Sequence, residues 1–399
     1  MKKAAIHRLV LVGFIVGALS ACGTVPERNP VPEEFAETAS IPGIPEARVW
    51  ADTVPKNLDE RVELFKDMFA KSRPEWVKSP TFLAISGGGQ NGAFGAGLLV
   101  GWTAAGTRPE FMVVTGISTG ALIAPFAFMG SAYDEKLEMV YTSTSTKDII
   151  NKRSLLAGAT SDALADTEPL KALIAEYFDQ EFLDGFVKEC RRGRSLLIAT
   201  TNLDSARPVE WRLCDIAMSG QPNSLALMHQ IILASTSIPG AFPPVIIEVE
   251  TEDGRRFDEL HVDGGATAQI FLYSNNLDLR KVLDEWGVEG SPSVYVIRNS
   301  QRRPQWKATE ASLGSIVGRS INSIIKYQGM GDIYRMYLGA KKDGLDFNAA
   351  FIPESFDASP EEPFDPVYMQ ALFELGHRLA VDGYPWLKTP DELAPAAQY

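Results

Sequence analysis

The stretch Val113-Val114-Thr115-Gly116-Ile117-Ser118-Thr119-Gly120 joins a short apolar strand to a G-x-S-x-G turn. A helix-like apolar run over 121–128 follows it directly. This order is typical of a nucleophile elbow, in which a sharp strand-to-helix turn exposes a serine hydroxyl. Glycines at 116 and 120 remove the Cβ atoms that would obstruct so tight a turn. Ser118 is therefore a candidate nucleophile, although a single pentapeptide of this kind also arises by chance.

A glycine-rich loop precedes this stretch. The apolar run 81–85 ends in Ser86-Gly87-Gly88-Gly89-Gln90-Asn91-Gly92, and 93–105 then has the composition of a helix rich in small residues. Uncovered amides of Gly87, Gly88 and Gly89 at a helix start form an anion site. Beside an activated serine, the anion would be the oxyanion of a tetrahedral intermediate.

The same loop also matches G-x-G-x-x-G through Gly87, Gly89 and Gly92, which is a nucleotide-binding pattern. A dinucleotide fold would place an acidic residue at the end of the next strand. The nearest acid, Glu110, precedes that strand, and the serine turn occupies its end. The sequence also has no Walker lysine in this loop. The acyl-transfer interpretation is therefore favoured over the nucleotide one.

Residues 1–21 have the layout of a signal peptide, with basic residues, an apolar core at 9–19 and small residues before Cys22. Leu-Ser-Ala-Cys resembles the bacterial lipobox, which predicts lipidation of Cys22 and anchoring to the cell envelope. Gly23 follows the cysteine, so by resemblance to the bacterial sorting rule we expect the outer membrane, facing the periplasm. An ordinary signal peptide with a coincidental cysteine is the alternative.

Residues 22–79 are rich in proline and glutamate and are expected to form a tether and an N-terminal extension, with one helix near 58–69. Residues 80–399 are expected to form one large domain. The formal net charge is −13, and the leader carries three basic residues, so the mature chain is more acidic still. Such a surface disfavours nucleic acid and does not attract anionic membranes electrostatically.

Helical and strand-like patterns alternate through the large domain, which predicts an α/β fold with a mostly parallel sheet covered by helices on both faces. Besides the runs already named, strands are expected at 195–201, 208–214, 245–249, 260–263, 293–297 and 347–352, and helices at 170–178, 182–190, 225–234, 313–338 and 368–381. Within the predicted helix at 313–338, Arg319, Asp332 and Arg335 are expected on the solvated surface.

Cysteine usage is consistent with an exported protein. Beyond Cys22 only Cys190 and Cys214 remain, and they could form one disulfide in an oxidising compartment or stay as two buried thiols. No cluster of cysteines and histidines has metal-ligand spacing, so no metal is predicted. No cofactor is predicted either.

The predicted strand at 260–263 ends in Asp263-Gly264-Gly265. An aspartate there would lie in a tightly turned, exposed site, but a plain β-turn accounts for the same residues. His261 lies two residues earlier and would share a strand face with Asp263, so it could neighbour a catalytic group. A hydrogen-bonded strand histidine without a catalytic role is the favoured interpretation of His261.

Taken together, the triple-glycine loop at 87–89, Gly116-Ile117-Ser118-Thr119-Gly120 and Asp263-Gly264-Gly265 resemble the patatin-like phospholipase family. The segment 235–244 resembles that family's proline-rich stretch, and the likeness runs from about residue 80 to residue 265. The resemblance implies a patatin-like fold and a Ser118–Asp263 dyad, with the amides of Gly87, Gly88 and Gly89 as the oxyanion hole. Asn91 departs from the family pattern, which usually has a basic residue there.

The resemblance implies a lipid acyl hydrolase that cleaves fatty acyl esters of phospholipids or lysophospholipids through an acyl-enzyme. The expected partners are a lipid substrate and the membrane that holds the N-terminal anchor. Two alternatives stay open. One is a lipid- or partner-binding lipoprotein that keeps the fold without activity, and the other is a broad carboxylesterase.

Overall fold

The computed structural model describes residues 28–72, 75–152, 163, 165–274 and 276–389. The predicted signal peptide and Cys22 lie outside the described residues. Among the helices that can be described, none is long and apolar enough to cross a membrane.

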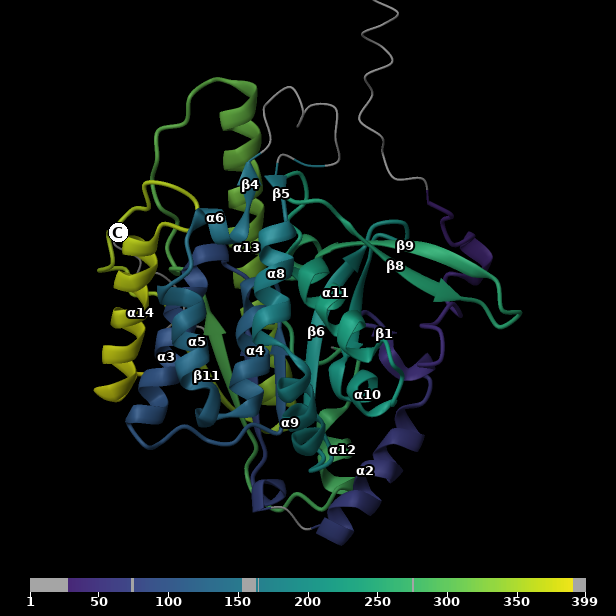
Figure 1. The fold of residues 1–399 in the computed structure, drawn as a ribbon. Helices are drawn as coiled ribbons and strands as arrows, with labels where there is room; N and C mark the ends of the chain where they lie inside the picture. Colours follow the sequence, from purple (N-terminus) through teal and green to yellow (C-terminus); the bar gives the residue numbers. More distant parts are fainter. Residues whose placement is uncertain (1–27, 73–74, 153–162, 164, 275, 390–399) are drawn as a thin grey trace, which may run out of the picture.

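A nine-stranded sheet organises the chain (Figure 1). Its hydrogen-bonded order is β1-β7-β6-β3-β2-β10-β11, and the hairpin of β8 and β9 joins through β9 to β6. The five central strands from β6 to β11 run parallel, whereas β1, β7, β8 and β9 pair antiparallel. The strands are β1 (Arg48–Trp50), β2 (Thr81–Ile85), β3 (Val113–Gly116), β6 (Ser195–Asn202), β7 (Arg207–Arg212), β8 (Val245–Glu250), β9 (Arg256–Asp263), β10 (Ser293–Arg298) and β11 (Asp346–Phe351). Two short strands, β4 (Asn151–Lys152) and β5 (Ala165–Asp166), form a separate pair.

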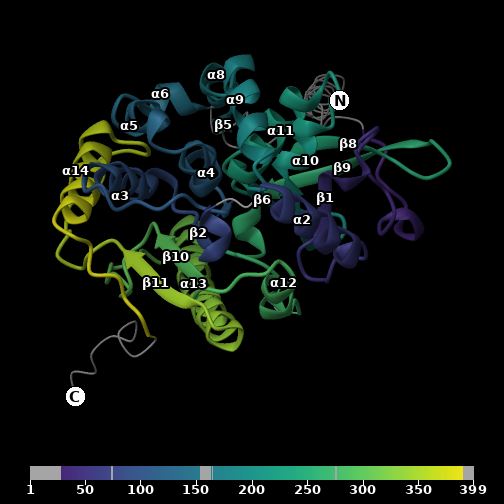
Figure 2. The same cartoon turned by 90° about the horizontal axis from the view of Figure 1, so that it is seen from below.

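Helices cover both faces of the parallel strands, as the sequence predicts (Figure 2). Figure 2 shows α3, α4 and α14 on one face and α12 and α13 on the other. Residues alternate between the two cores: Leu83 and Ile85 pack with α3 and α14, whereas Phe82 and Ala84 face the cluster on the α13 side. The helices are α2 (Leu58–Ser72), α3 (Gly92–Ala104), α4 (Thr119–Met129), α5 (Asp134–Thr142), α6 (Thr146–Ile149), α8 (Glu168–Tyr177), α9 (Gln180–Cys190), α10 (Leu213–Met218), α11 (Ser224–Thr236), α12 (Leu279–Glu285), α13 (Leu313–Asp343) and α14 (Pro366–Val381).

The described part of the N-terminal extension, from residue 28, packs on the large domain. From Arg28 onward the chain follows the β8–β9 hairpin, and β1 adds an edge strand beside β7. The buried guanidinium of Arg48 forms an ion pair with Glu259 of β9. The partners of this extension lie about 200 residues away in the sequence, so no local pattern predicts these contacts.

The pairing of β6 decides where the end of β3 and the end of β9 lie relative to each other. Its lower part, up to Ile198, pairs with β3, and Gly116 lies opposite Ile198. Along the same side, Thr200 to Asn202 pair with β9, and Asp263 lies opposite Thr200. Strand β7 runs along the other edge of β6. The end of β3 and the end of β9 therefore lie about two residues apart, roughly 7 Å along one strand edge.

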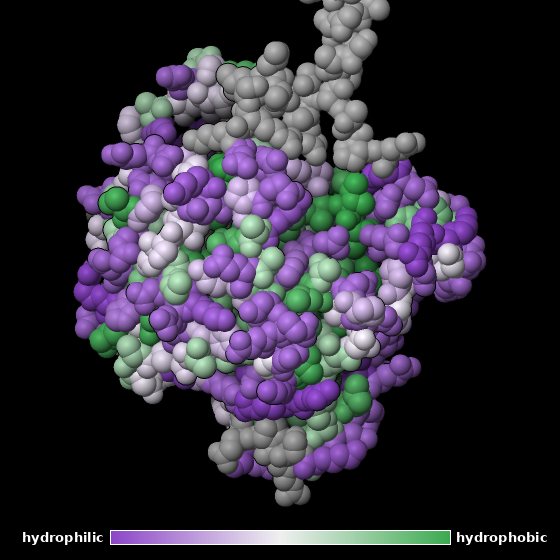
Figure 3. Space-filling model, viewed as in Figure 1, coloured by the Kyte–Doolittle hydropathy of each residue, from purple (hydrophilic) through white to green (hydrophobic). Residues whose placement is uncertain are grey.

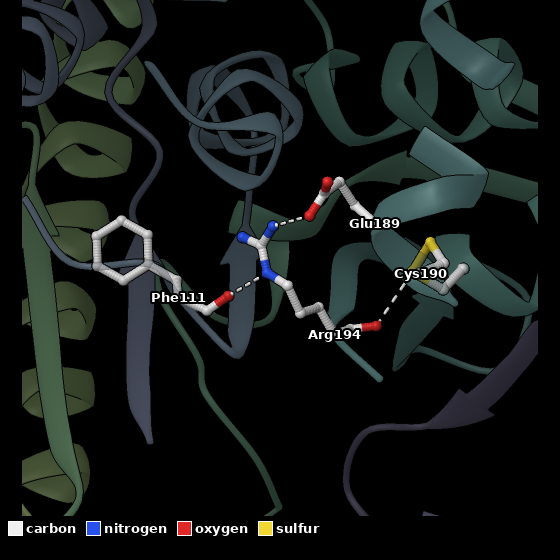
Figure 4. Close-up of a disulfide and its surroundings, with 5 residues drawn as sticks. Phe111, Glu189, Cys190 and Arg194 are labelled. Atoms are coloured by element: carbon white, nitrogen blue, oxygen red, sulfur yellow. Dashed lines mark hydrogen bonds and ion pairs between the residues drawn. A yellow bond between two sulfur atoms is a disulfide. The ribbon is translucent and has the colours of Figure 1, made fainter. Parts of the chain in front are cut away.

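A disulfide joins Cys190, the last residue of α9, to Cys214 in α10, so this structure has the bridge and not two thiols. Figure 4 shows the bridge beside Arg194, which donates hydrogen bonds to the Phe111 carbonyl at 2.7 Å and to Glu189 at 2.7 Å. The bridge thus ties two surface helices together at the start of β6, away from the end of β6 where β9 pairs.

Replacing both cysteines by alanine is expected to lower the free energy of unfolding by about 3 kcal/mol, because the bridge closes a loop of about 24 residues in the unfolded chain. Denaturant titration of wild type and of Cys190→Ala/Cys214→Ala measures this change. Wild type with reductant is the matched control and should approach the double variant. Equal stability of oxidised wild type, reduced wild type and double variant would contradict the prediction.

Candidate active site

Ser118 stands at the turn between β3 and α4, in the conformation that a nucleophile elbow requires. Its backbone has φ 55° and ψ −125°, a region that residues with a side chain rarely adopt. A Cβ on Gly116 would lie 2.3 Å from the Gly120 carbonyl oxygen, and one on Gly120 would lie 2.3 Å from the Ile85 carbonyl oxygen. Only glycine allows α4 to approach β2 and β3 this closely, which explains both glycines of the motif.

Asp263 ends β9 next to Ser118, whose hydroxyl acts as a hydrogen-bonding group that lowers the pKa of the Asp263 carboxyl. Its Oδ1 also accepts the Gly265 amide at 2.7 Å, and only 3% of the residue is exposed. Burial is the largest influence and raises the pKa of Asp263 to about 7, although both hydrogen bonds act in the opposite direction. The strand-end pairing on β6 thus brings together two residues that are 145 positions apart in the sequence.

A second serine, Ser235, hydrogen-bonds to the turn that carries Ser118. The Ser118 amide donates to Ser235 Oγ at 3.0 Å, and the Ser235 hydroxyl donates to the Ala199 carbonyl of β6 at 2.7 Å. Ser235 is fully buried near the end of α11. Ser237, two residues after Ser235, holds Asp263, because the Asp263 amide donates to the Ser237 carbonyl at 2.9 Å. One short segment therefore aligns both members of the Ser118–Asp263 pair.

The triple-glycine loop lies against Ser118, with Gly87 the nearest of the three. A Cβ on Gly87 would be 3.2 Å from the Ser118 Cβ, and a Cβ on Gly88 would be 2.6 Å from the Asn299 carbonyl oxygen. The Gly87 amide donates to the Gln269 carbonyl at 3.2 Å. The Gly87 amide thus has an acceptor inside the protein, and the oxyanion role of the amides of Gly87, Gly88 and Gly89 stays a prediction.

Gln269 connects the loop to the aspartate turn, and the sequence alone did not single it out. Its side-chain amide donates to the Gly265 carbonyl at 2.7 Å and to Gln328 Oε1 at 3.2 Å. Its own backbone amide donates to Asp332 Oδ2 at 2.7 Å. Asp332 is only 3% exposed, so the expectation that it lies on the solvated surface is wrong. Gln269 makes these contacts only because the fold packs residues 265–269 against α13.

A buried cation lies beside the loop. Arg298 ends β10, and its guanidinium approaches the Gly87 carbonyl at 3.5 Å. Burial lowers the pKa of Arg298 to about 10, so the group remains charged at neutral pH. Asn91, which replaces a basic residue of the family pattern, instead accepts the Tyr368 hydroxyl of α14 at 2.8 Å. The positive charge near this loop therefore comes from another strand.

His261 is a fully buried strand histidine, as favoured from the sequence. Its Nδ1 lies 2.9 Å from the Thr200 hydroxyl, and its Nε2 lies 3.0 Å from Glu259. Glu259 in turn pairs with Arg48 of the N-terminal extension. Burial is the largest influence on the pKa of His261 and lowers it. Both ring nitrogens are thus engaged with groups other than Ser118 and Asp263.

The surface around the site is more apolar than its surroundings. Figure 3 shows a mainly hydrophilic face with a hydrophobic patch above α11, where the ends of β8 and β9 lie. Ile238, in the loop whose Ser237 carbonyl holds Asp263, is 36% exposed. Exposed apolar surface on the segment that holds Asp263 is compatible with contact to a long acyl chain.

Comparison with known proteins gives one family. Residues 83–279 match the model described as patatin-like phospholipase. No curated protein matches the chain. Among solved structures, VipD from Legionella pneumophila is similar at 11% identity and a TM-score of 0.30, over 79% of this chain and 69% of that one. Human GIVD cytosolic phospholipase A2 is similar at 12% identity and a TM-score of 0.30, over 80% of this chain but only 55% of that one.

Proposed function

Residues 83–279 form a domain of the patatin-like phospholipase family, and from this premise we propose that the chain hydrolyses fatty acyl esters of phospholipids with Ser118 as nucleophile and Asp263 as general base. The observation that carries the proposal is the strained elbow of Ser118 beside the buried Asp263 carboxyl, whose pKa the Ser118 hydroxyl lowers against the effect of burial. A carboxylate of ordinary pKa is a weak base toward serine, and the raised pKa near 7 brings Asp263 into the useful range.

In the acylation step, Asp263 takes the Ser118 proton as Oγ attacks the ester carbonyl. The carbonyl oxygen becomes an oxyanion, which the amides of Gly88 and Gly89 would stabilise. Asp263 then returns the proton to the leaving alcohol, and the acyl group stays on Ser118. A water molecule, deprotonated by Asp263, attacks the acyl-enzyme and releases the fatty acid.

Positive charge near Ser118 favours the negative charge that develops on the carbonyl oxygen during acylation. The charged Arg298 lies next to the Gly87 carbonyl, and the N-terminus of α4 begins directly after Ser118. A helix N-terminus carries a partial positive charge, and burial strengthens its effect because water does not screen it. These features favour an ester hydrolase over a binding protein, because a binding role does not require a strained serine beside a carboxylate of raised pKa.

A series of esters tests the reaction class. Hydrolysis of p-nitrophenyl esters from acetate to palmitate should increase with chain length, and a diacyl phospholipid should release free fatty acid. Activity limited to short soluble esters would instead identify a broad carboxylesterase. Absence of hydrolysis with every ester and lipid would leave the binding lipoprotein as the better account.

We also propose that Cys22 is lipidated and holds the protein at the outer membrane, facing the periplasm. The Leu-Ser-Ala-Cys sequence supports this, and the disulfide between Cys190 and Cys214 is of the kind that persists in oxidising compartments. Growth with a radiolabelled fatty acid should label wild type and leave Cys22→Ser unlabelled. Equal labelling of the two would reject this assignment.

A further inference from the structure

The first half of α13 projects from the domain, and among the described residues its apolar side chains have no buried contact. Residues 313–328 include no buried residue, and five large apolar residues between Leu313 and Ile324 are exposed by 46–80%. In Figure 1 this end of α13 rises at the top of the view, beyond the sheet. A helix half that buries so little gains almost no stability from its own fold, so an external apolar surface would stabilise it.

The exposed apolar residues share one helix face. From Leu313 they recur at i+3, i+4, i+8, i+11 and i+14, which is the spacing of an amphipathic helix. The members of this face are Leu313, Ile316, Val317, Ile321, Ile324 and Tyr327. Arg319 and Lys326 lie on the opposite face with Ser315 and Asn322.

Trp306 lies in the loop before α13 and is 90% exposed. Two cations of α13 hold this loop beside the helix: Arg319 donates to the Gln305 carbonyl at 2.5 Å, and Lys326 donates to the Gln301 carbonyl. An exposed tryptophan next to an amphipathic helix is typical of the interface between lipid head groups and acyl chains. We call residues 301–327 the docking segment.

Charge distinguishes the docking segment from the rest of the protein. It contains five basic residues and one acidic residue, although the whole chain has a formal net charge of −13. The members are Arg302, Arg303, Lys307, Arg319 and Lys326 against Glu310. The overall charge predicts no attraction to an anionic membrane, but the local charge has the sign that such a membrane attracts.

The docking segment is also tied to the catalytic groups. Gln328, directly after it, donates to the Thr267 carbonyl at 2.6 Å and accepts a hydrogen bond from Gln269 at 3.2 Å. Gln269 in turn contacts both the Gly265 carbonyl and the Gly87 amide. The docking segment therefore continues directly into the part of α13 that contacts the loops beside Ser118 and Asp263.

We propose that the docking segment binds the surface of an anionic phospholipid bilayer, with Trp306 and the apolar face of α13 in the interface and the basic residues against the head groups. This inference rests on the proposed lipid substrate and names the surface that supplies it. A second copy of the chain fits less well, because a two-fold contact through this segment would set its five cations against five others.

Co-sedimentation with vesicles tests the proposal on a chain that starts at Gly23 and so keeps every described residue without the anchor. Wild type should bind vesicles of phosphatidylcholine with one-third phosphatidylglycerol roughly tenfold more tightly than vesicles of phosphatidylcholine alone. Ile316→Ser/Ile324→Ser should weaken binding to both by roughly tenfold or more, because two exposed apolar side chains leave the interface. Arg303→Glu/Lys307→Glu should abolish the preference for phosphatidylglycerol.

Two controls separate this proposal from the catalytic one. Leu64→Ser on α2 removes an apolar side chain of similar exposure, 59%, at the opposite end of the molecule and should bind like wild type (Figure 1). Ser118→Ala should bind vesicles normally while it hydrolyses nothing, and the docking variants should cleave a short soluble ester at the wild-type rate. Wild-type binding by both docking variants would overturn the proposal. So would a wild-type dimer that Ile316→Ser/Ile324→Ser converts to a monomer in sedimentation velocity, because it would make the apolar face an interface between copies.

Discussion

Ser118→Ala is expected to reduce hydrolysis of a phospholipid by on the order of 10⁴-fold or more, to a level near the background rate. The reason is the loss of Ser118 Oγ, the atom proposed to form the acyl-enzyme, which lies at the strained elbow beside Asp263. The fold should survive, because alanine carries the same Cβ at φ 55° and removes only one hydroxyl. Initial rates of fatty acid release measure the effect.

A fluorophosphonate probe adds a direct readout of the nucleophile. It should label wild type at Ser118, as peptide mass spectrometry would locate, and should leave Ser118→Ala unlabelled. Ser143→Ala is the matched control, because Ser143 is an exposed serine outside the site. Substantial activity in Ser118→Ala, or a label on another serine, would show that the nucleophile is assigned to the wrong residue.

Asp263→Asn is expected to reduce hydrolysis by on the order of 10³-fold or more, because asparagine cannot accept the Ser118 proton. The pKa near 7 also predicts the pH dependence of wild type. Asp263 acts as a base only when it is ionised, so activity should be low at pH 5, half-maximal near pH 7 and constant above about pH 8. Initial rates across this range with a substrate stable to base measure the profile.

The raised pKa of Asp263 also predicts that stability falls with rising pH, whereas activity rises. Its pKa in the folded protein is raised above the value near 4 of an unfolded chain, so the folded state binds the extra proton between about pH 4 and pH 7. Stability from this group therefore falls as pH rises through that window. Asp263→Asn removes the effect, so the variant should gain stability relative to wild type between pH 4 and pH 8.

Two variants decide the base assignment. Asp382→Asn changes an exposed aspartate outside the site and should leave both the rate and the pH profile as in wild type. His261→Ala should affect stability through the loss of its bonds to Thr200 and Glu259, and should retain the pH midpoint near 7. If Asp263→Asn stayed active while His261→Ala lost activity, the base would be the histidine.

The sequence by itself determined the local parts of this protein. The strand, turn and helix around Ser118 and the glycine loop at 87–89 depend on neighbouring residues, because apolar runs define the strands and glycines permit the tight turns. The α/β class and the positions of most strands along the chain followed from the same alternation of patterns. The helix at 313–338 was also expected, since small and apolar residues recur along it at helical spacing.

Only the tertiary structure decided how these parts meet. Asp263 reaches Ser118 because β9 takes over the edge of β6 that β3 leaves free, and no local pattern encodes that pairing. For the same reason the sequence did not predict that Gln269, buried Asp332 and Arg298 lie beside the site, nor that the Gly87 amide donates to the Gln269 carbonyl. Burial of a charged side chain, the pKa of a carboxylate and the exposure of an apolar helix face all depend on distant segments. Sequence periodicity could therefore predict α13, but only the packed fold revealed that its first half has no partner within the described chain.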